Sequence, residues 1–109
     1  MIRSGAVVAA VLLATPALPA AAEGPNADAL WEAHCMVCHG DDGRAETEEG
    51  RKKKARNLTD ARWQATVSDD RLASSIRRGR DNMPTFGKKL NAEQIKALVA
   101  HVRSLAAKK

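Results

Sequence analysis

The sequence predicts a small all-α domain. Three segments carry the capping residues and apolar spacing of helices, and no segment shows the regular alternation of a half-buried strand. Polar stretches containing Gly and Pro separate these helices, which indicates long connecting loops. With 109 residues, the chain has the size of a single domain.

Residues 1–22 are interpreted as a secretory signal peptide. Arg3 supplies a positive start, residues 6–14 are continuously apolar, and the small residues 20–22 offer a cleavage site. The apolar stretch is short for a membrane span, although an uncleaved N-terminal anchor is the alternative. We therefore expect a mature domain at residues 23–109, located in the periplasm without stable membrane insertion.

The first helix is expected at residues 27–38, with Asn26 as its N-cap. Four residues fall at helical spacing and are expected to form one inward-packing face: Ala27, Leu30, Trp31 and His34.

Residues 40–57 are expected to form a loop, because their only apolar side chains are Ala45 and Ala55. The loop contains a basic run from Arg51 to Arg56. This run is either a docking patch or a solvated mobile loop, and charge runs of this kind favour the solvated loop.

The second helix is expected at residues 69–78. Ser68 is its N-cap, Asp69 and Asp70 suit its positive end, and Gly79 can terminate it.

The third helix is expected at residues 92–106, where Asn91 and Gln94 match a capping box. Its apolar stripe is expected to face the core: Ile95, Leu98, Val99, Val102 and Leu105.

The run Cys35-Met36-Val37-Cys38-His39 has the C-x-x-C-H spacing that attaches a c-type haem. Two thiols at this spacing reach the two vinyl groups on one porphyrin edge, and the next residue places an imidazole under the iron. A thioredoxin-like redox motif would need a βαβ pattern, and a zinc site would need further ligands at finger spacing. Neither is present, so we predict one covalent haem c on Cys35 and Cys38, with His39 as an iron ligand.

A domain this short buries little surface by itself and usually needs a disulfide, a metal or a cofactor to be stable. The haem is therefore expected to form the core, and the apoprotein to be largely unfolded. The net charge of the whole chain is +5 at pH 7, which favours redox partners with an acidic docking surface. No nucleic-acid-binding motif is present, and nucleic acid is excluded as a partner.

The second axial ligand of the iron has four candidates: Met36, Met83, His34 and His101. Met36 lies between the attaching cysteines and cannot cross to the opposite face. His34 is expected on a helix surface, and His101 to pack or lie exposed on the last helix. Met83 lies in a Gly- and Pro-containing loop, and the Pro that follows biases it towards extended backbone. We therefore predict Met83 as the ligand.

Taken together, these features resemble the small class I cytochromes c of bacteria. The resemblance rests on five segments of the mature chain: the first helix with Ala27 and Trp31, Cys35 to Gly40, Asn57 to Thr59, Met83-Pro84 and the last helix. It implies the class I cytochrome c fold, with about three main helices and long loops wrapped around one His/Met-ligated haem.

The resemblance also implies contacts within the fold. It pairs Ala27 and Trp31 of the first helix with Leu98 and His101 of the last, and it places Trp63 near the haem edge.

The chain departs from the resembled family at two points. The family often has Tyr or Phe where His101 stands, and it commonly has a Pro in the loop after the haem histidine, where none occurs here. A backbone carbonyl near Ala55 or Arg56 is then expected to orient His39.

The predicted function is one-electron transfer between redox partner proteins by a monomeric carrier that is not itself an enzyme. Lys88 and Lys89 are the first docking candidates, and the basic run from Arg51 to Arg56 is expected to matter less. The alternatives are a haem subunit of a periplasmic dehydrogenase, and a gas-binding or peroxidatic haem protein with an open sixth site.

Overall fold

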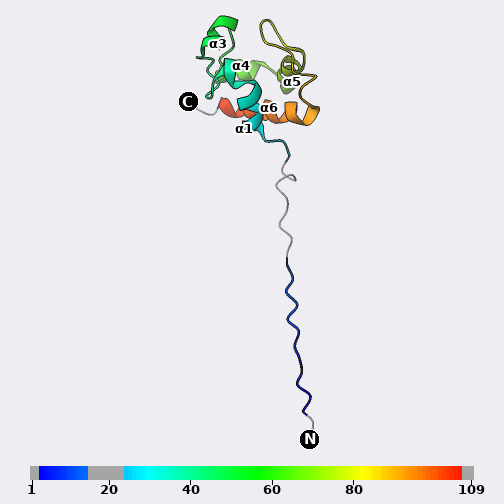
Figure 1. Cartoon of the computed structure of the whole chain (residues 1–109). Helices are drawn as coiled ribbons and strands as arrows, with labels where there is room; N and C mark the ends of the chain where they lie inside the picture. Colours follow the sequence, from blue (N-terminus) through cyan, green and yellow to red (C-terminus); the bar gives the residue numbers. More distant parts are fainter. Residues whose placement is uncertain (1–2, 15–23, 107–109) are drawn as a thin grey trace.

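The computed structural model describes residues 3–14 and 24–106, and all its regular elements are helices. Residues 3–14 are exposed and extend away from the helical domain (Figure 1). The expected cleavage site after Ala22 lies outside the described residues. The elements in chain order are α1 (Ala27–His34), α2 (Met36–His39), α3 (Glu48–Lys53), α4 (Ala61–Thr66), α5 (Asp69–Arg78) and α6 (Ala92–Leu105). The all-α prediction is confirmed, and within the described ranges no helix is long and apolar enough to cross a membrane.

The first and last helices pack against each other, as the resemblance implied. Asn26 caps α1 by accepting a hydrogen bond from the Ala29 backbone N–H at 3.1 Å. Trp31 is 3% exposed, and its ring lies 4.8 Å from that of His101 on α6. Two large rings therefore fill the crossing of α1 and α6.

The expected helix at residues 27–38 is divided in two at Cys35. The helix α1 ends at His34, and α2 runs from Met36 to His39, with Gly40 as its C-cap at a φ of +77°. The Trp31 indole N–H donates to the Gly40 carbonyl at 3.0 Å. The buried Trp31 side chain therefore fixes the C-terminal end of α2 against the core.

The expectation of a loop throughout residues 40–57 is wrong, because α3 lies within it. The Thr47 hydroxyl accepts from the Gly50 backbone N–H at 2.9 Å and lies at the same distance from the carbonyls of Val37 and Cys38. A Cβ built on Gly50 would collide with the Cys38 carbonyl. The helix α3 thus packs backbone to backbone on α2.

The helix α4 is an element that the sequence interpretation did not include. Asp60 caps it by accepting from the backbone N–H groups of Arg62 and Trp63. Gln64 is buried, and its side-chain amide donates to the carbonyls of Leu58 and Val102 at 2.7 and 2.8 Å. This amide ties α4 and the preceding loop to α6.

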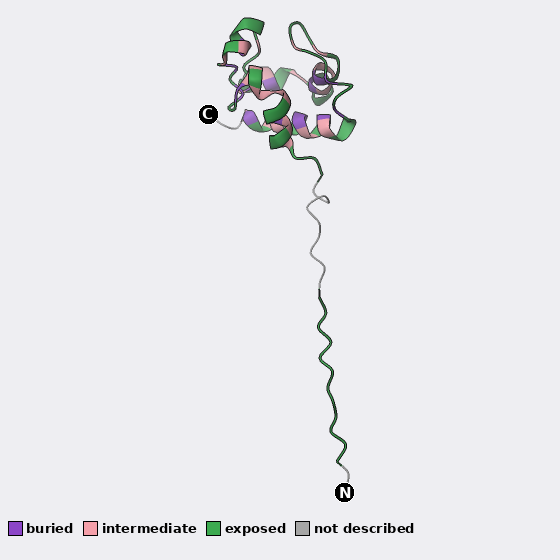
Figure 2. Cartoon of the chain, in the orientation of Figure 1, coloured by how far each residue is buried: buried purple, intermediate pink, exposed green. Residues whose placement is uncertain are grey.

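The helices α5 and α6 occur where they were predicted, except that α6 ends at Leu105, with Ala106 as its C-cap. Ser68 caps α5, and both bonds of the Asn91–Gln94 capping box are formed. The expected apolar stripe of α6 is buried throughout (Figure 2). The core cluster consists of Trp31, Leu58, Leu72, Ile76, Phe86, Leu90, Ile95, Leu98, Val99, Val102 and Leu105.

Candidate haem site

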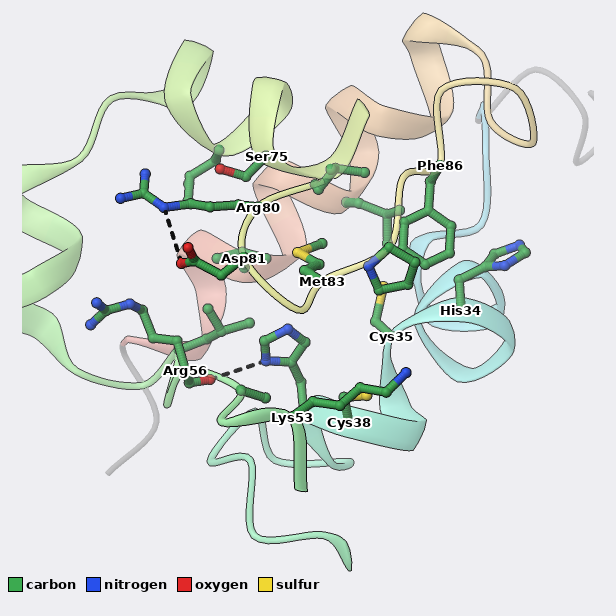
Figure 3. A pocket seen from close by; sticks show the side chains of 18 of the residues that line it. His34, Cys35, Cys38, Lys53, Arg56, Ser75, Arg80, Asp81, Met83 and Phe86 are labelled. Carbon is green, nitrogen blue, oxygen red and sulfur yellow. Dashed lines mark hydrogen bonds and ion pairs between the residues drawn. The ribbon is translucent and has the colours of Figure 1, made fainter. Parts of the chain in front are cut away.

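A cavity of about 1000 Å³ opens between α2, the segment from Lys53 to Trp63, α5 and the loop that follows α5. The four predicted site residues, Cys35, Cys38, His39 and Met83, all line this cavity (Figure 3). Its floor is apolar and belongs to the core: Trp31, Leu58, Leu72, Ile76, Phe86, Leu98 and Val102. The fold therefore brings together residues that are far apart in the sequence.

The His39 imidazole is held from the side by a backbone carbonyl. Its Nδ1 lies 3.0 Å from the Arg56 carbonyl oxygen. A carbonyl near Ala55 or Arg56 was expected from the sequence to orient this ring. Burial lowers the pKa of His39 below its usual value, and the bond to Arg56 opposes this effect. The ring is therefore neutral at pH 7 and donates through Nδ1, which leaves Nε2 as a lone-pair donor for a metal.

The two cysteines are free thiols and are half-buried at one side of the cavity. Burial raises the pKa of the Cys35 thiol to about 11, so this group is uncharged at neutral pH. Val37 between them is 62% exposed. The α2 turn thus directs both thiols towards the cavity and leaves the largely exposed Val37 at the cavity opening.

Met83 belongs to a tight turn on the opposite wall. Arg80 and Met83 exchange two backbone hydrogen bonds, of 2.8 and 3.3 Å. The Met83 side chain is half-buried against the core, and its sulfur extends into the cavity (Figure 3).

The other ligand candidates from the sequence lie differently. The half-buried His34 also lines the cavity, but its ring packs edge-on against Phe86, with ring centroids 5.7 Å apart, instead of lying free on a helix surface. His101 does not line the cavity and lies against Trp31, and its buried Nε2 has no hydrogen-bond partner among the described residues. Met36 packs on the core cluster.

Charged side chains around the cavity are mostly basic. Six cationic residues line it, against two acidic ones, Asp60 and Asp81. The cationic residues are Lys53, Lys54, Arg56, Arg71, Arg80 and Lys89. The Arg56 guanidinium lies 4.5 Å from the centre of the Trp63 ring, which also faces the cavity. The basic run from Arg51 to Arg56 was expected to matter less for docking, yet three of its five basic residues, Lys53, Lys54 and Arg56, border the site.

The fold and this arrangement together define a c-type cytochrome domain. The family model described as "Cytochrome C oxidase, cbb3-type, subunit III" matches residues 22–102, and the chain belongs to this family. The cytochrome c resemblance seen in the sequence is thereby confirmed.

Individual relatives agree with this assignment. The chain is 35% identical over 88 residues to the Cbb3-type cytochrome c oxidase subunit FixP of Azorhizobium caulinodans, covering 80% of this chain and 28% of that protein. It is 34% identical over 84 residues to FixP of Bradyrhizobium diazoefficiens, covering 76% of this chain and 28% of that protein. The chain therefore spans only about a quarter of the length of these curated relatives.

Among solved structures, the KustC0563 c-type cytochrome matches with a TM-score of 0.70 and 40% identity, covering 74% of this chain and 98% of that one. A point mutant of the same cytochrome matches with a TM-score of 0.69 and 40% identity, covering 74% and 99% of the two chains. These matches confirm the helical fold.

The cavity fits the haem that this family implies. A neutral imidazole and a thioether are suitable donors for haem iron, and the two cysteine thiols have the spacing required for covalent attachment. The apolar floor suits the porphyrin, and the excess of cationic residues suits its two carboxylates.

Proposed function

We propose that this chain is a monohaem c-type cytochrome that transfers single electrons between redox partner proteins. One observation carries the proposal: Cys35, Cys38, His39 and Met83 come from two walls of one cavity with an apolar floor. Haem c bound there supplies the Fe(III)/Fe(II) couple.

Each residue then has a defined role. Cys35 and Cys38 would hold the haem through thioether bonds, and His39 and Met83 would be the protein ligands of its iron. The Arg56 carbonyl fixes the tautomer and orientation of His39. A thioether ligand favours Fe(II) and raises the reduction potential. With His39 and Met83 both as ligands, the iron would lack an open position for substrate, which supports the role of a carrier over that of an enzyme or a gas-binding protein.

Denaturing electrophoresis with haem stain tests the attachment, because covalent haem stays with the polypeptide, whereas loss of colour into acid–acetone would refute it. The cytochrome c resemblance implies a weak absorption band of the ferric protein at about 695 nm, in keeping with His/Met coordination. Met83→Ala should abolish this band and lower the potential, and Met36→Ala should do neither. If Met83→Ala changes nothing, another residue binds the iron, and His101 is the next to test.

We further propose export to the periplasm, with residues 1–22 removed as a signal peptide. Export is required for attachment of c-type haem in bacteria, and the N-terminal composition matches a secretory signal. N-terminal sequencing of the holoprotein should begin at Glu23. A chain that begins at Met1 in the membrane fraction would instead identify an anchor.

The partner is proposed to present an acidic surface to the basic rim of the cavity. Lys89 remains a docking candidate, and Lys53, Lys54 and Arg56 join it because they line the same opening. Electron transfer with the natural partner should slow as ionic strength rises, since screening shortens the range of attraction to about 8 Å at physiological salt. A rate independent of salt would contradict electrostatic docking.

The chain is proposed to act as a free monomer, because its described residues form one core cluster beside one cavity that holds all four predicted haem residues. A subunit role is the second candidate, since the FixP relatives are named as oxidase subunits. The enzyme that contains such a subunit would be an oxidase, as for FixP, or a periplasmic dehydrogenase. Gel filtration of native extract separates these cases: a free carrier elutes alone, and a subunit elutes with its enzyme.

A further inference from the structure

A side-chain hydrogen bond joins the two walls of the cavity. The Asn82 side-chain amide donates to the Lys53 backbone carbonyl at 3.1 Å. Lys53 is the last residue of α3, on the wall that carries His39, and Asn82 precedes Met83 on the other wall. Within the described part of the chain, no other hydrogen bond connects residues 79–90 with residues 40–58.

The carbonyl that accepts this bond is available because α3 ends there. The last four carbonyls of a helix have no partner within the helix. Lys54 stops α3 in a left-handed conformation, with a φ of +54°, and its N–H bonds back to residues 50 and 51. The Lys53 carbonyl is thereby left to accept from outside the helix.

The position of Asn82 is transmitted directly to Met83. The paired backbone bonds between Arg80 and Met83 close a tight turn whose two central residues are Asp81 and Asn82. Asp81 has a φ of +52°, and a Cβ on Gly79 would lie 2.6 Å from the Met83 carbonyl oxygen. So compact a turn moves as a unit, and a bond to Asn82 restrains Met83 as well.

We propose that Asn82 is a positioning residue for Met83, and that its bond to the Lys53 carbonyl keeps the methionine turn closed against the His39 wall. This inference rests on the proposed role of Met83 as axial ligand. When the Met83 thioether dissociates from the iron, the turn must move away from the His39 wall. The bond from Asn82 to the Lys53 carbonyl opposes that motion. Loss of the bond should therefore speed dissociation of Met83 without removing the ligand.

The test measures how fast Met83 leaves the iron of the ferric holoprotein. Cyanide binds haem iron only after the methionine has dissociated, so at high cyanide concentration the binding rate reaches the dissociation rate of Met83. Asn82→Asp replaces the donor amide with a carboxylate that can only accept. We expect the limiting rate to rise about tenfold, which is the effect of losing about 1.4 kcal/mol of hydrogen bonding.

Asn57→Asp is the matched control. Asn57 also lines the cavity, but its side chain accepts hydrogen bonds from the Thr59 N–H and hydroxyl at 2.9 and 2.7 Å. An aspartate keeps both bonds and adds the same negative charge. This variant should retain the wild-type limiting rate.

The outcomes separate the two proposals. A faster rate in Asn82→Asp alone supports the positioning role. Equal rates in all three proteins, or equal increases in both variants, overturn it while leaving Met83 ligation intact. If the wild-type protein lacks the methionine band and its cyanide rate never saturates, the axial role of Met83 fails, and the positioning role fails with it.

Discussion

Gln64→Met should destabilise the holoprotein by about 2 kcal/mol. The Gln64 amide is buried and donates to two carbonyls, those of Leu58 and Val102. Val102 lies in the last turn of α6, where carbonyls lack partners along the helix. Met has a similar length but no donor, so two hydrogen bonds worth about 1 kcal/mol each are lost. Gln64→Glu should cost more, about 4 kcal/mol, because it places a carboxylate beside both carbonyls.

Guanidinium unfolding of the ferric protein, followed by far-UV circular dichroism, measures these losses. The control is Gln94→Met, which removes only the exposed capping bond to the Asn91 N–H and should cost about 0.5 kcal/mol. If Gln64→Met and Gln94→Met lose the same small free energy, the buried amide contributes nothing net, and the reasoning is refuted.

Two further substitutions have defined expectations. Gly43→Ala should lower the free energy of unfolding by about 2 kcal/mol, since a Cβ there lies 2.6 Å from Leu105 Cδ1 and φ is +81°. Gly24→Ala, with a φ of +83° but open space, should cost less in the same denaturation assay. His101→Phe keeps a ring against Trp31 and removes Nε2, which has no partner among the described residues, at the loss of the 3.6 Å contact between Nδ1 and the exposed Asp28 carboxylate. The melting temperature should rise by a few degrees, because the buried nitrogen costs about 1 kcal/mol and an exposed contact contributes less. A lower melting temperature would mean that the imidazole contributes net stability, through the Asp28 contact or through a water bound to Nε2.

The long helices were predictable because each depends on local signals. Helix α5 begins after Ser68 and ends at Gly79, and α6 begins with the Asn91–Gln94 capping box. These caps act within one turn of the helix and are visible in the sequence. The apolar stripe of α6 then shows which face is buried.

The short helices α3 and α4 were missed for a physical reason. Helices of six residues do not persist by themselves, and α3 has no apolar face to reveal it. Its stability comes from Thr47 and Gly50 against the backbone of α2, which is a contact between distant segments. The cap at Thr47, the glutamates after it and the basic last turn were local signals for α3, and the cap at Asp60 was one for α4.

The helix α3, which was not predicted from the sequence, also explains which features of the site could not be predicted. The attaching turn and the methionine loop have their own motifs, so their residues were found. The approach of Lys53 to Asn82 depends on where α3 ends and how it packs, and the basic run reaches the cavity rim for the same reason.

The close packing of α3 on α2 has a consequence for how this sequence can diversify. Position 50 is closed to every residue with a Cβ, because the Cys38 carbonyl occupies that space and the Ala45 carbonyl lies 2.8 Å away. In a library randomised at this position and sorted for red colonies, only glycine should survive. The neighbouring exposed positions 51–53 should accept most residues. An invariant glycine among variable positions would then be the expected result of the contact between α3 and the haem-attaching turn.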